Sequence, residues 1–579
     1  MTARKNGFYK GSFTLAFAVF LFMVFFAGMN KALAVTTPDV IGDNMVLQQN
    51  KVLPIWGWAE PGEKIKVTFE KQERTTVSDR EGNWMVKLDP VQAGGPFEMT
   101  IEGKNKIIMK NILVGEVWLA GGQSNMRMNV GGVENAKEEI KNADYPKIRL
   151  FVTRYACMEV PQKNISLWYD YLQETVKPLD LMQYLWKFYG VKTPMDGKWV
   201  ECSSQTVKDF SAAGYFFGRK VHEETSFPVG LIQSCWGATA IEAWISKSSL
   251  ESDPALKDIV DRREKLLNDY PQAISAYYKE MANYIKMKGE MPDPKNGSAN
   301  TIAGKTLSPP KVPVGPAQKT AIAQAGVDYY TNTIEYRILL GNYVFPTGMY
   351  NGMIEPIIPY AIQGVIWYQG ESNVGNQKQY KTLFPLLIKS WRSAWNQGDF
   401  PFLFVQLANV GASREKPASS SWAALREAQT TGLAVPKTGM AVAIDIGDTD
   451  VHAKNKQDVG LRLALWALGN TYKQKVVYSG PLYEKMEIEN NQIRLYFKNI
   501  GGGLVAKGGD VLKQFAIADD GKVFEWADAR IDGNTVVVWS TTIANPVAVR
   551  YAWADNPEGC NLYNKEGLPA SPFRTDDWQ

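Results

Sequence analysis

Histidine is nearly absent from this chain of 579 residues, which contains only His222 and His452. Any chemistry that needs an imidazole therefore depends on one of two positions. An excess of charge of one sign is also lacking, since 64 Lys and Arg residues face 60 Asp and Glu residues, for a net charge of +4. A nucleic-acid-binding protein needs a basic face for the phosphates, so this balance argues against that class.

Cysteine is scarce as well, and the four residues are Cys157, Cys202, Cys235 and Cys560. They are too few and too scattered for a disulfide scaffold. None forms the C-x-x-C pair that is typical of a structural zinc site. The sequence leaves open whether any of the four thiols pair.

Long apolar runs are lacking except near the start of the chain. Arg4, Lys5 and Lys10 precede an apolar stretch at 13–29, and Ala32-Leu33-Ala34 follows it. This order predicts a secretory signal peptide at 1–34, cleaved after Ala34. The alternative is a membrane anchor, because the run could nearly span a bilayer. The cleavage triplet favours the signal peptide, so we expect a soluble mature protein in the periplasm or outside the cell.

The hydrophobic period changes twice along the mature chain. In residues 35–110, apolar and polar side chains alternate, for example at Ile65, Val67 and Phe69, and Gly and Pro turns separate the runs. This pattern predicts an N-terminal β-sandwich. The period of two returns in residues 471–579, where we expect a C-terminal β-sandwich.

The middle of the chain, residues 111–470, alternates short apolar runs with helical patterns. Strands are expected at 117–120, 229–233, 364–368, 402–407 and 441–445, and helices at 211–224, 380–395 and 454–468. Continuous apolar strands with helices between them predict an α/β fold, a parallel sheet with helices on both faces. Segments near 157–195 and 251–340 break the spacing, and we interpret them as insertions at the rim of the sheet.

A serine follows the first of these strands, within Gly121-Gly122-Gln123-Ser124-Asn125. Open α/β sheets bind their ligands beyond the carboxyl ends of the strands, and glycines let a substrate approach the backbone. Ser124 is therefore a candidate nucleophile. Taken alone, a serine in this place is more typical of a helix N-cap.

His452 follows the last predicted strand through the acidic loop Asp448-Thr449-Asp450-Val451. A hydroxyl nucleophile is weak until a base removes its proton, and histidine suits that task. Either Asp450 or Asp448 is near enough in sequence to orient the imidazole. Taken alone, His452 could be a surface loop residue. His222 lies inside a helical stretch, where we expect a half-exposed structural histidine.

Two more polar strand ends could supply donors to an oxyanion. Gly237 follows the strand at 229–233 and can offer a backbone N–H, and Asn373 follows the strand at 364–368 and can offer an amide. Each alone is typical of a turn. Four polar, glycine-bearing strand ends at one edge of one sheet together indicate a site.

These motifs together resemble those of the SGNH hydrolases, and more narrowly the sialate O-acetylesterase family of secreted bacterial carbohydrate esterases. The resemblance covers nearly the whole mature chain, including the segments 44–48, 114–118, 350–353, 367–373 and 567–574. It implies an SGNH-type, flavodoxin-like sheet flanked by the two β-sandwiches. It also implies that the reaction needs no metal or organic cofactor.

The resemblance assigns roles to particular residues. It implies Ser124 as nucleophile, His452 as base, and oxyanion donors from the Ser124 backbone, Gly237 and the Asn373 side chain. The wider SGNH pattern has Asp three residues before the histidine, where this chain has Thr449. We predict Asp450 as the orienting acid, with Asp448 or a backbone carbonyl as alternatives.

A second departure lies directly after the histidine. The family usually has a proline there, where this chain has Ala453. Substrate contacts are predicted at Gln123, Asn125 and Glu371.

The predicted function is removal of O-acetyl groups from carbohydrate through an acetyl-enzyme, with 9-O-acetylated sialic acid as the substrate that the family implies. One alternative keeps the chemistry and changes the glycan to xylan, xyloglucan or another polymer. A second alternative is a non-catalytic glycan-binding protein. We expect no nucleic-acid partner and no membrane contact of the mature form, and the oligomeric state stays open.

Overall fold

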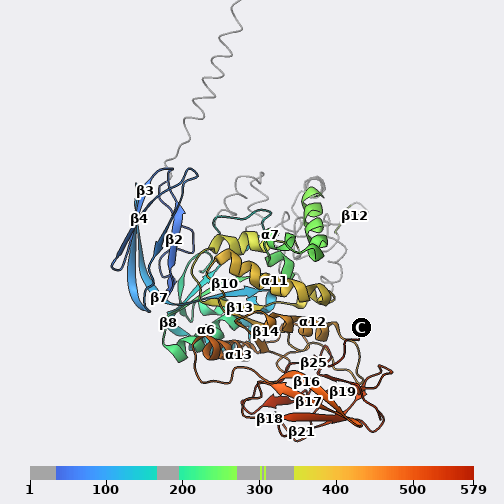
Figure 1. Ribbon diagram of the computed structural model, residues 1–579. Helices are drawn as coiled ribbons and strands as arrows, with labels where there is room; N and C mark the ends of the chain where they lie inside the picture. Colours follow the sequence, from blue (N-terminus) through green and yellow to red (C-terminus); the bar gives the residue numbers. More distant parts are fainter. Residues whose placement is uncertain (1–33, 166–194, 270–299, 303–304, 308–344, 579) are drawn as a thin grey trace, which may run out of the picture. The chain divides into compact units, whose positions relative to one another are not determined.

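The computed structural model describes residues 34–165, 195–269, 300–302, 305–307 and 345–578 (Figure 1). The described residues form two compact units, a small one with residues 34–37, 54–88 and 98–109, and a large one with residues 38–53, 89–97 and the described residues from 110 onward. Apart from Ala34, the predicted signal peptide lies outside the described residues. So does most of each predicted insertion.

The small unit consists of β-strands. Its strands are β2 (Leu53–Trp58), β3 (Lys64–Phe69), β4 (Gln72–Val77), β5 (Asn83–Leu88), and parts of β6 (Gly94–Glu102) and β7 (Lys106–Gly122). β3 pairs antiparallel with both β4 and β6. Ile65, Val67 and Phe69 of β3 are buried and the residues between them are partly exposed, as the period of two predicts.

The large unit contains the predicted parallel sheet. Its strand order is β15 (Thr438–Val442), β14 (Phe402–Gln406), β13 (Gly364–Tyr368), β7, β10 (Val229–Cys235), β8 (Asp144–Val152) and β9 (Val200–Ser203). β9 alone in this order pairs antiparallel, and β1 (Val46–Gln48) adds a parallel pairing to β7. The predicted α/β fold class is confirmed. The last strand begins and ends three residues earlier than predicted, and Ala443 and Ile444 beyond it are buried without being part of it.

Helices cover both faces of this sheet. The helices are α6 (Ala212–Thr225), α11 (Gln377–Trp395), α12 (Ser421–Thr430) and α13 (Lys456–Trp466). Trp118 of β7 contacts Phe217 of α6, with ring centroids 4.9 Å apart. Gly121, at odd spacing from Trp118, faces Trp391 of α11 instead. Because alternate residues of a strand point to opposite faces, α6 and α11 cover opposite sides of the sheet (Figure 1).

Shorter elements connect these layers. They are α2 (Ser124–Arg127), α3 (Ala136–Lys141), α7 (Lys247–Glu251), the single-turn helices η1 (Val130–Gly132), η2 (Val207–Asp209), η3 (Ile241–Trp244), η4 (Pro254–Leu256), η5 (Tyr350–Ile354), η6 (Glu355–Ile357), η7 (Glu371–Asn373), η8 (Thr431–Ala434) and η9 (Ala467–Thr471), and the hairpin β11 (Asn300–Ile302) and β12 (Lys305–Leu307). Within the described ranges, no helix is long and apolar enough to cross a bilayer.

The C-terminal part of the large unit is again made of β-strands. One sheet has the order β16 (Leu482–Glu489), β17 (Gln492–Lys498), β22 (Thr535–Trp539), β21 (Asp528–Asp532), another β20 (Glu525–Trp526), β19 (Phe515–Ala518), β23 (Ala548–Tyr551), β25 (Phe573–Arg574), and β18 (Leu504–Ala506) pairs with β24 (Leu562–Asn564). Phe573 of β25 stacks on Tyr483 of β16, with ring centroids 4.7 Å apart, so the two larger sheets share a core. The domain boundaries at 110 and 470 stay predictions.

Candidate active site

The predicted site residues follow the carboxyl ends of four strands of the parallel sheet. Ser124 begins α2 after β7, and Gly237 follows β10. Asn373 ends η7 after β13, and His452 lies in the loop after β15. Because parallel strands end at the same edge of a sheet, these four residues share that edge.

Gly237 lies against Ser124. A Cβ placed on Gly237 would lie 3.5 Å from the Cβ of Ser124. The turn is held there because the Trp236 N–H donates to the carbonyl of Gly122 at 3.0 Å. Ala238 has a φ of 58°, so the backbone bends in the left-handed region directly after Gly237. This turn therefore places the Gly237 backbone, which carries no side chain, next to Ser124.

Gln123 connects the turn before Ser124 to the loop after β13. Its backbone N–H donates to the Tyr368 carbonyl at 3.0 Å. Its Oε1 accepts from the N–H groups of Gly370 and Ser372, each at 3.3 Å. The side chain is buried and its oxygen has protein partners, so Gln123 fixes one loop against another. Its predicted contact with substrate stays a prediction.

Asn125 connects α2 to the loop that carries His452. Its Nδ2 donates to the Val451 carbonyl at 2.9 Å and to Glu371 Oε1 at 2.5 Å. The residue after Ser124 is thus bonded to the residue before His452. Within the described residues, Ser124 and His452 share no hydrogen bond, and such catalytic bonds often shorten only when substrate binds. The predicted contact of Asn125 and Glu371 with substrate also stays a prediction.

Of the two candidate acids, Asp450 is the one that contacts the histidine. Its Oδ1 accepts from the backbone N–H of His452 at 2.6 Å and lies 3.1 Å from the ring nitrogen Nδ1. Asp448 instead accepts from the backbone and hydroxyl of Thr449. The Asp450 and His452 side chains are 68% and 38% exposed, so solvent screens their attraction. Asp450 can orient the ring and leave Nε2 as the base.

Asn373 is buried, and its amide orientation is fixed. Its Oδ1 accepts from the backbone of Ile241 at 2.9 Å and from Gln369 Nε2 at 2.7 Å. Its Nδ2 donates to Glu242 Oε2 at 3.2 Å, and the other oxygen of Glu242 pairs with Arg262. An amide nitrogen carries two hydrogens, so Asn373 has one N–H beyond this bond.

A partly buried carboxyl group and a buried lysine contact Asn125, the residue after Ser124. Burial raises the pKa of Glu371, whose Oε2 has no hydrogen-bond partner among the described residues. Burial lowers the pKa of Lys456 to about 8, and the field of Glu371 opposes that fall. Lys456 Nζ donates to Asn125 Oδ1 at 2.8 Å. Sequence reasoning missed Lys456, since nothing in the local pattern at the start of α13 indicates a buried charge.

The aromatic residues near the motifs belong to the core. From sequence they could either stack on a sugar or pack beneath the site, and all four are buried: Trp118, Trp236, Trp367 and Tyr368. Trp367 makes edge-on contacts with Trp244 and Trp391, at centroid distances of 5.8 and 5.5 Å. His222 is partly buried in α6, where its Nδ1 lies 2.6 Å from the Phe227 carbonyl.

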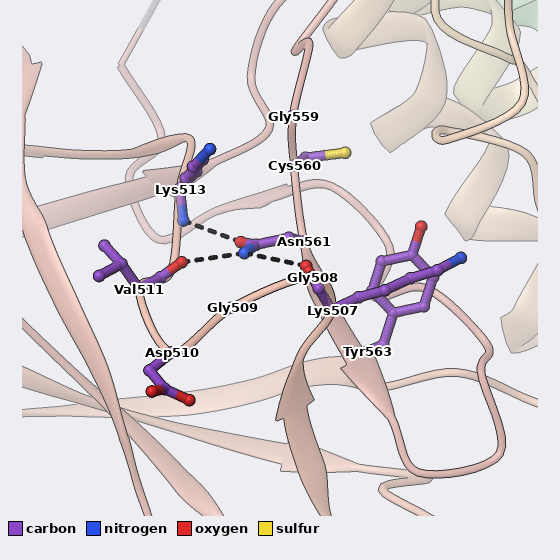
Figure 2. Close-up of a pocket in the computed structure, with 10 residues that line it drawn as sticks. All are labelled: Lys507, Gly508, Gly509, Asp510, Val511, Lys513, Gly559, Cys560, Asn561 and Tyr563. Atoms are coloured by element: carbon purple, nitrogen blue, oxygen red, sulfur yellow. Dashed lines mark hydrogen bonds between the residues drawn. The ribbon is translucent and has the colours of Figure 1, made fainter.

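A cavity of about 400 Å³ lies in the C-terminal strands and contains none of the predicted site residues (Figure 2). Several polar groups of its lining are hydrogen-bonded to other groups of the protein. Asn561 accepts from the Lys513 backbone and donates to the Val511 carbonyl, both at 2.9 Å. Tyr563 donates to Asp445 Oδ2 at 2.8 Å, and Lys507 lies 4.6 Å from the centre of its ring. The candidate catalytic residues lie outside this cavity, at the strand ends of the parallel sheet.

Comparisons with known proteins agree on one family. A family described as carbohydrate esterase, sialic acid-specific acetylesterase, matches residues 340–468, which include Asn373 and His452. Human sialate O-acetylesterase is 28% identical over 610 aligned residues, 96% of each chain. The mouse sialate O-acetylesterase is 27% identical, covering 92% of this chain and 93% of its own.

A solved structure extends this similarity to the fold. A carbohydrate acetylesterase from Xanthomonas citri is 31% identical, covers 94% of this chain and 100% of its own, and superposes with a TM-score of 0.71. The similarity thus extends over nearly the whole chain. The chain belongs to the sialate O-acetylesterase family and is a carbohydrate esterase that acts on acetylated carbohydrate.

Proposed function

We propose that this esterase removes the 9-O-acetyl group of sialic acid through an acetyl-enzyme formed on Ser124. The observation that carries the proposal is the pair of hydrogen bonds from Asn125 to Val451 and Glu371, at 2.9 and 2.5 Å. They tie the helix of the serine to the loop of the histidine and to the loop of Asn373. A nucleophile, a base and an amide donor then share one strand edge.

The reaction follows from these roles. His452 takes the proton of the Ser124 hydroxyl as the oxygen attacks the acetyl carbonyl, and Asp450 orients the ring. The carbonyl oxygen gains negative charge in the tetrahedral intermediate. The sugar alcohol leaves with the proton from His452, and water then hydrolyses the acetyl-enzyme with the same base.

Donors to the developing oxyanion come from three sources in this proposal. They are the backbone N–H groups of Ser124 and Gly237 and the remaining N–H of Asn373. Replacing Asn373 with alanine is expected to lower kcat on 4-nitrophenyl acetate on the order of 10²–10³-fold, because the donor acts chiefly in the transition state. KM should change little. Steady-state kinetics at saturating substrate measures this.

The matched control is Asn376→Ala, since Asn376 is exposed and its amide bonds only Gln379 among the described contacts. This variant should keep the wild-type kcat. If Asn373→Ala also keeps the wild-type kcat, Asn373 is not a donor to the oxyanion.

A positive charge near the serine supports an acidic sugar over a neutral one. Arg127 lies three residues after Ser124 on α2, and its guanidinium is 5.1 Å from the centre of the Tyr155 ring. Tyr155 in turn packs edge-on against Trp236, next to Gly237, at 5.1 Å. A guanidinium can bind a carboxylate through two parallel hydrogen bonds, and sialic acid carries a carboxylate that xylan lacks.

Acetate release across a substrate panel tests this choice. We expect a higher kcat/KM on 9-O-acetylated sialic acid than on acetylated xylan or acetylated xyloglucan, because only the first can pair with Arg127. Assays with Ser124→Ala enzyme give the background. A preference for either neutral polymer would change the substrate and leave the chemistry in place.

We also propose that residues 1–34 direct export and are removed after Ala34, so that the enzyme works in the periplasm or outside the cell. Amino-terminal sequencing of exported protein should begin at Val35. A chain that keeps residues 1–34 in the membrane fraction would favour the anchor instead.

A further inference from the structure

We propose that Lys456 is a positioning residue that holds the backbone of His452 in place against the helix of Ser124. This inference rests on the proposed function, because it assigns a device to the same site. Lys456 belongs to no motif that the sequence singled out.

The backbone carbonyls on both sides of His452 are held by buried side chains. The Val451 carbonyl accepts from Asn125 Nδ2 at 2.9 Å. The Ala453 carbonyl accepts from Lys456 Nζ. We call Asn125 and Lys456 the carbonyl clamp. These bonds hold the Val451–His452 peptide and the Ala453–Lys454 peptide, so the backbone around His452 has little freedom.

The two side chains of the carbonyl clamp also fix each other. Lys456 Nζ donates to Asn125 Oδ1 at 2.8 Å, while Glu371 Oε1 accepts from Asn125 Nδ2 at 2.5 Å. The amide thus has a cation on its oxygen and a carboxylate on its nitrogen. A flipped amide would turn its NH₂ group toward the ammonium of Lys456 and its oxygen toward the carboxylate of Glu371, and both contacts would be repulsive. The orientation in which Nδ2 donates to the Val451 carbonyl is therefore the favoured one.

Neither helix stability nor packing explains a lysine at this position. Lys456 is the first residue of α13, where the helix dipole disfavours a cation. Its side chain is 0% exposed, and burial of an ammonium is costly unless it is well paired. It lies over the face of Tyr368, 5.4 Å from the ring centre, which partly offsets that cost. The hydrogen bonds of Lys456 to Asn125 and to the Ala453 carbonyl therefore explain why a lysine stands at this position.

Lys456→Met is the direct test, because methionine keeps much of the apolar stem and loses the ammonium. We expect kcat on 4-nitrophenyl acetate to fall on the order of 10²-fold, as for a catalytic group misplaced by about 1 Å. KM should change little, since Lys456 itself has no substrate contact in this proposal. Lys454→Met is the matched control, because Lys454 is exposed in the same loop, and it should keep the wild-type kcat.

The pH dependence of kcat gives a second test, which begins with the wild-type enzyme. Loss of the Lys456 proton weakens its charge-assisted bonds, so kcat should fall several-fold as the pH rises through about 8. The titratable groups that face Lys456 are Glu371, from the loop after β13, and Tyr368 of β13. Lys454→Met should show the same alkaline fall, and Lys456→Met should not.

The outcomes separate the two proposals. If Ser124→Ala keeps its activity, the proposed function is wrong. If Ser124→Ala loses its activity and Lys456→Met keeps it, only the proposed role of Lys456 is wrong. A wild-type kcat that stays flat to pH 9.5, with an unchanged circular dichroism spectrum, would also overturn the clamp.

Discussion

Replacing Ser124 with alanine is expected to lower kcat on 4-nitrophenyl acetate on the order of 10⁶-fold, the scale of loss when a Ser-His-Asp unit loses its serine. The proposed reaction has no other nucleophile at the strand edge. The fold should survive, since the Ser124 hydroxyl has no hydrogen-bond partner among the described contacts and alanine favours a helix. Removing the hydroxyl leaves no buried polar group unpaired.

The measurement is kcat at saturating ester, together with the burst of 4-nitrophenol that an acetyl-enzyme produces. Ser124→Ala should show neither turnover nor burst at an unchanged melting temperature. Ser248→Ala, at an exposed position of α7, should show both. A Ser124→Ala enzyme with the wild-type burst would show that another group carries the acetyl, and the assignment of His452 as its base would fall too.

Much of the sheet could be predicted because apolar runs report burial. The strands β7, β10, β13 and β14 lie where continuous apolar residues stand between polar turns. The same signal misplaced β15, because Ala443 and Ile444 are buried beyond the last ladder pair at Val442. β8 was not predicted, since its first residues, Asp144–Lys147, are polar or proline and only its second half is buried.

The site could be predicted as far as strand ends reveal it. Ser124 and His452 are 328 positions apart, yet parallel strands bring their ends to one edge. The partners of Gln123 and Asn125 could not be read locally, since the bonds to Gly370 and Lys456 span 247 and 331 positions. A polar residue beside a candidate nucleophile therefore suggested substrate contact, where the structure gives each side chain partners within the protein.

Long-range polar bonds also hold the C-terminal strands to the hydrolase sheet, and Arg426 shows how. Arg426 of α12 is fully buried and ends in hydrogen bonds to four backbone carbonyls, at Leu407, Ala408, Ala554 and Asp555, all within 2.7–2.8 Å. The first two follow β14, and the other two follow β23. One guanidinium thus satisfies loops from two parts of the large unit. Burial lowers its pKa to about 10, so it keeps its charge at neutral pH.

Arg426→Met is expected to lower the free energy of unfolding by more than about 4 kcal/mol, since each buried carbonyl left unpaired costs about 1–3 kcal/mol. Urea unfolding with a constant slope measures the loss as a shift of the midpoint. Arg530→Met, at an exposed position of β21, should stay within about 0.5 kcal/mol of wild type. If both variants unfold at the wild-type midpoint, the two loops are held by packing alone, and Arg426 adds no more than the water it replaces.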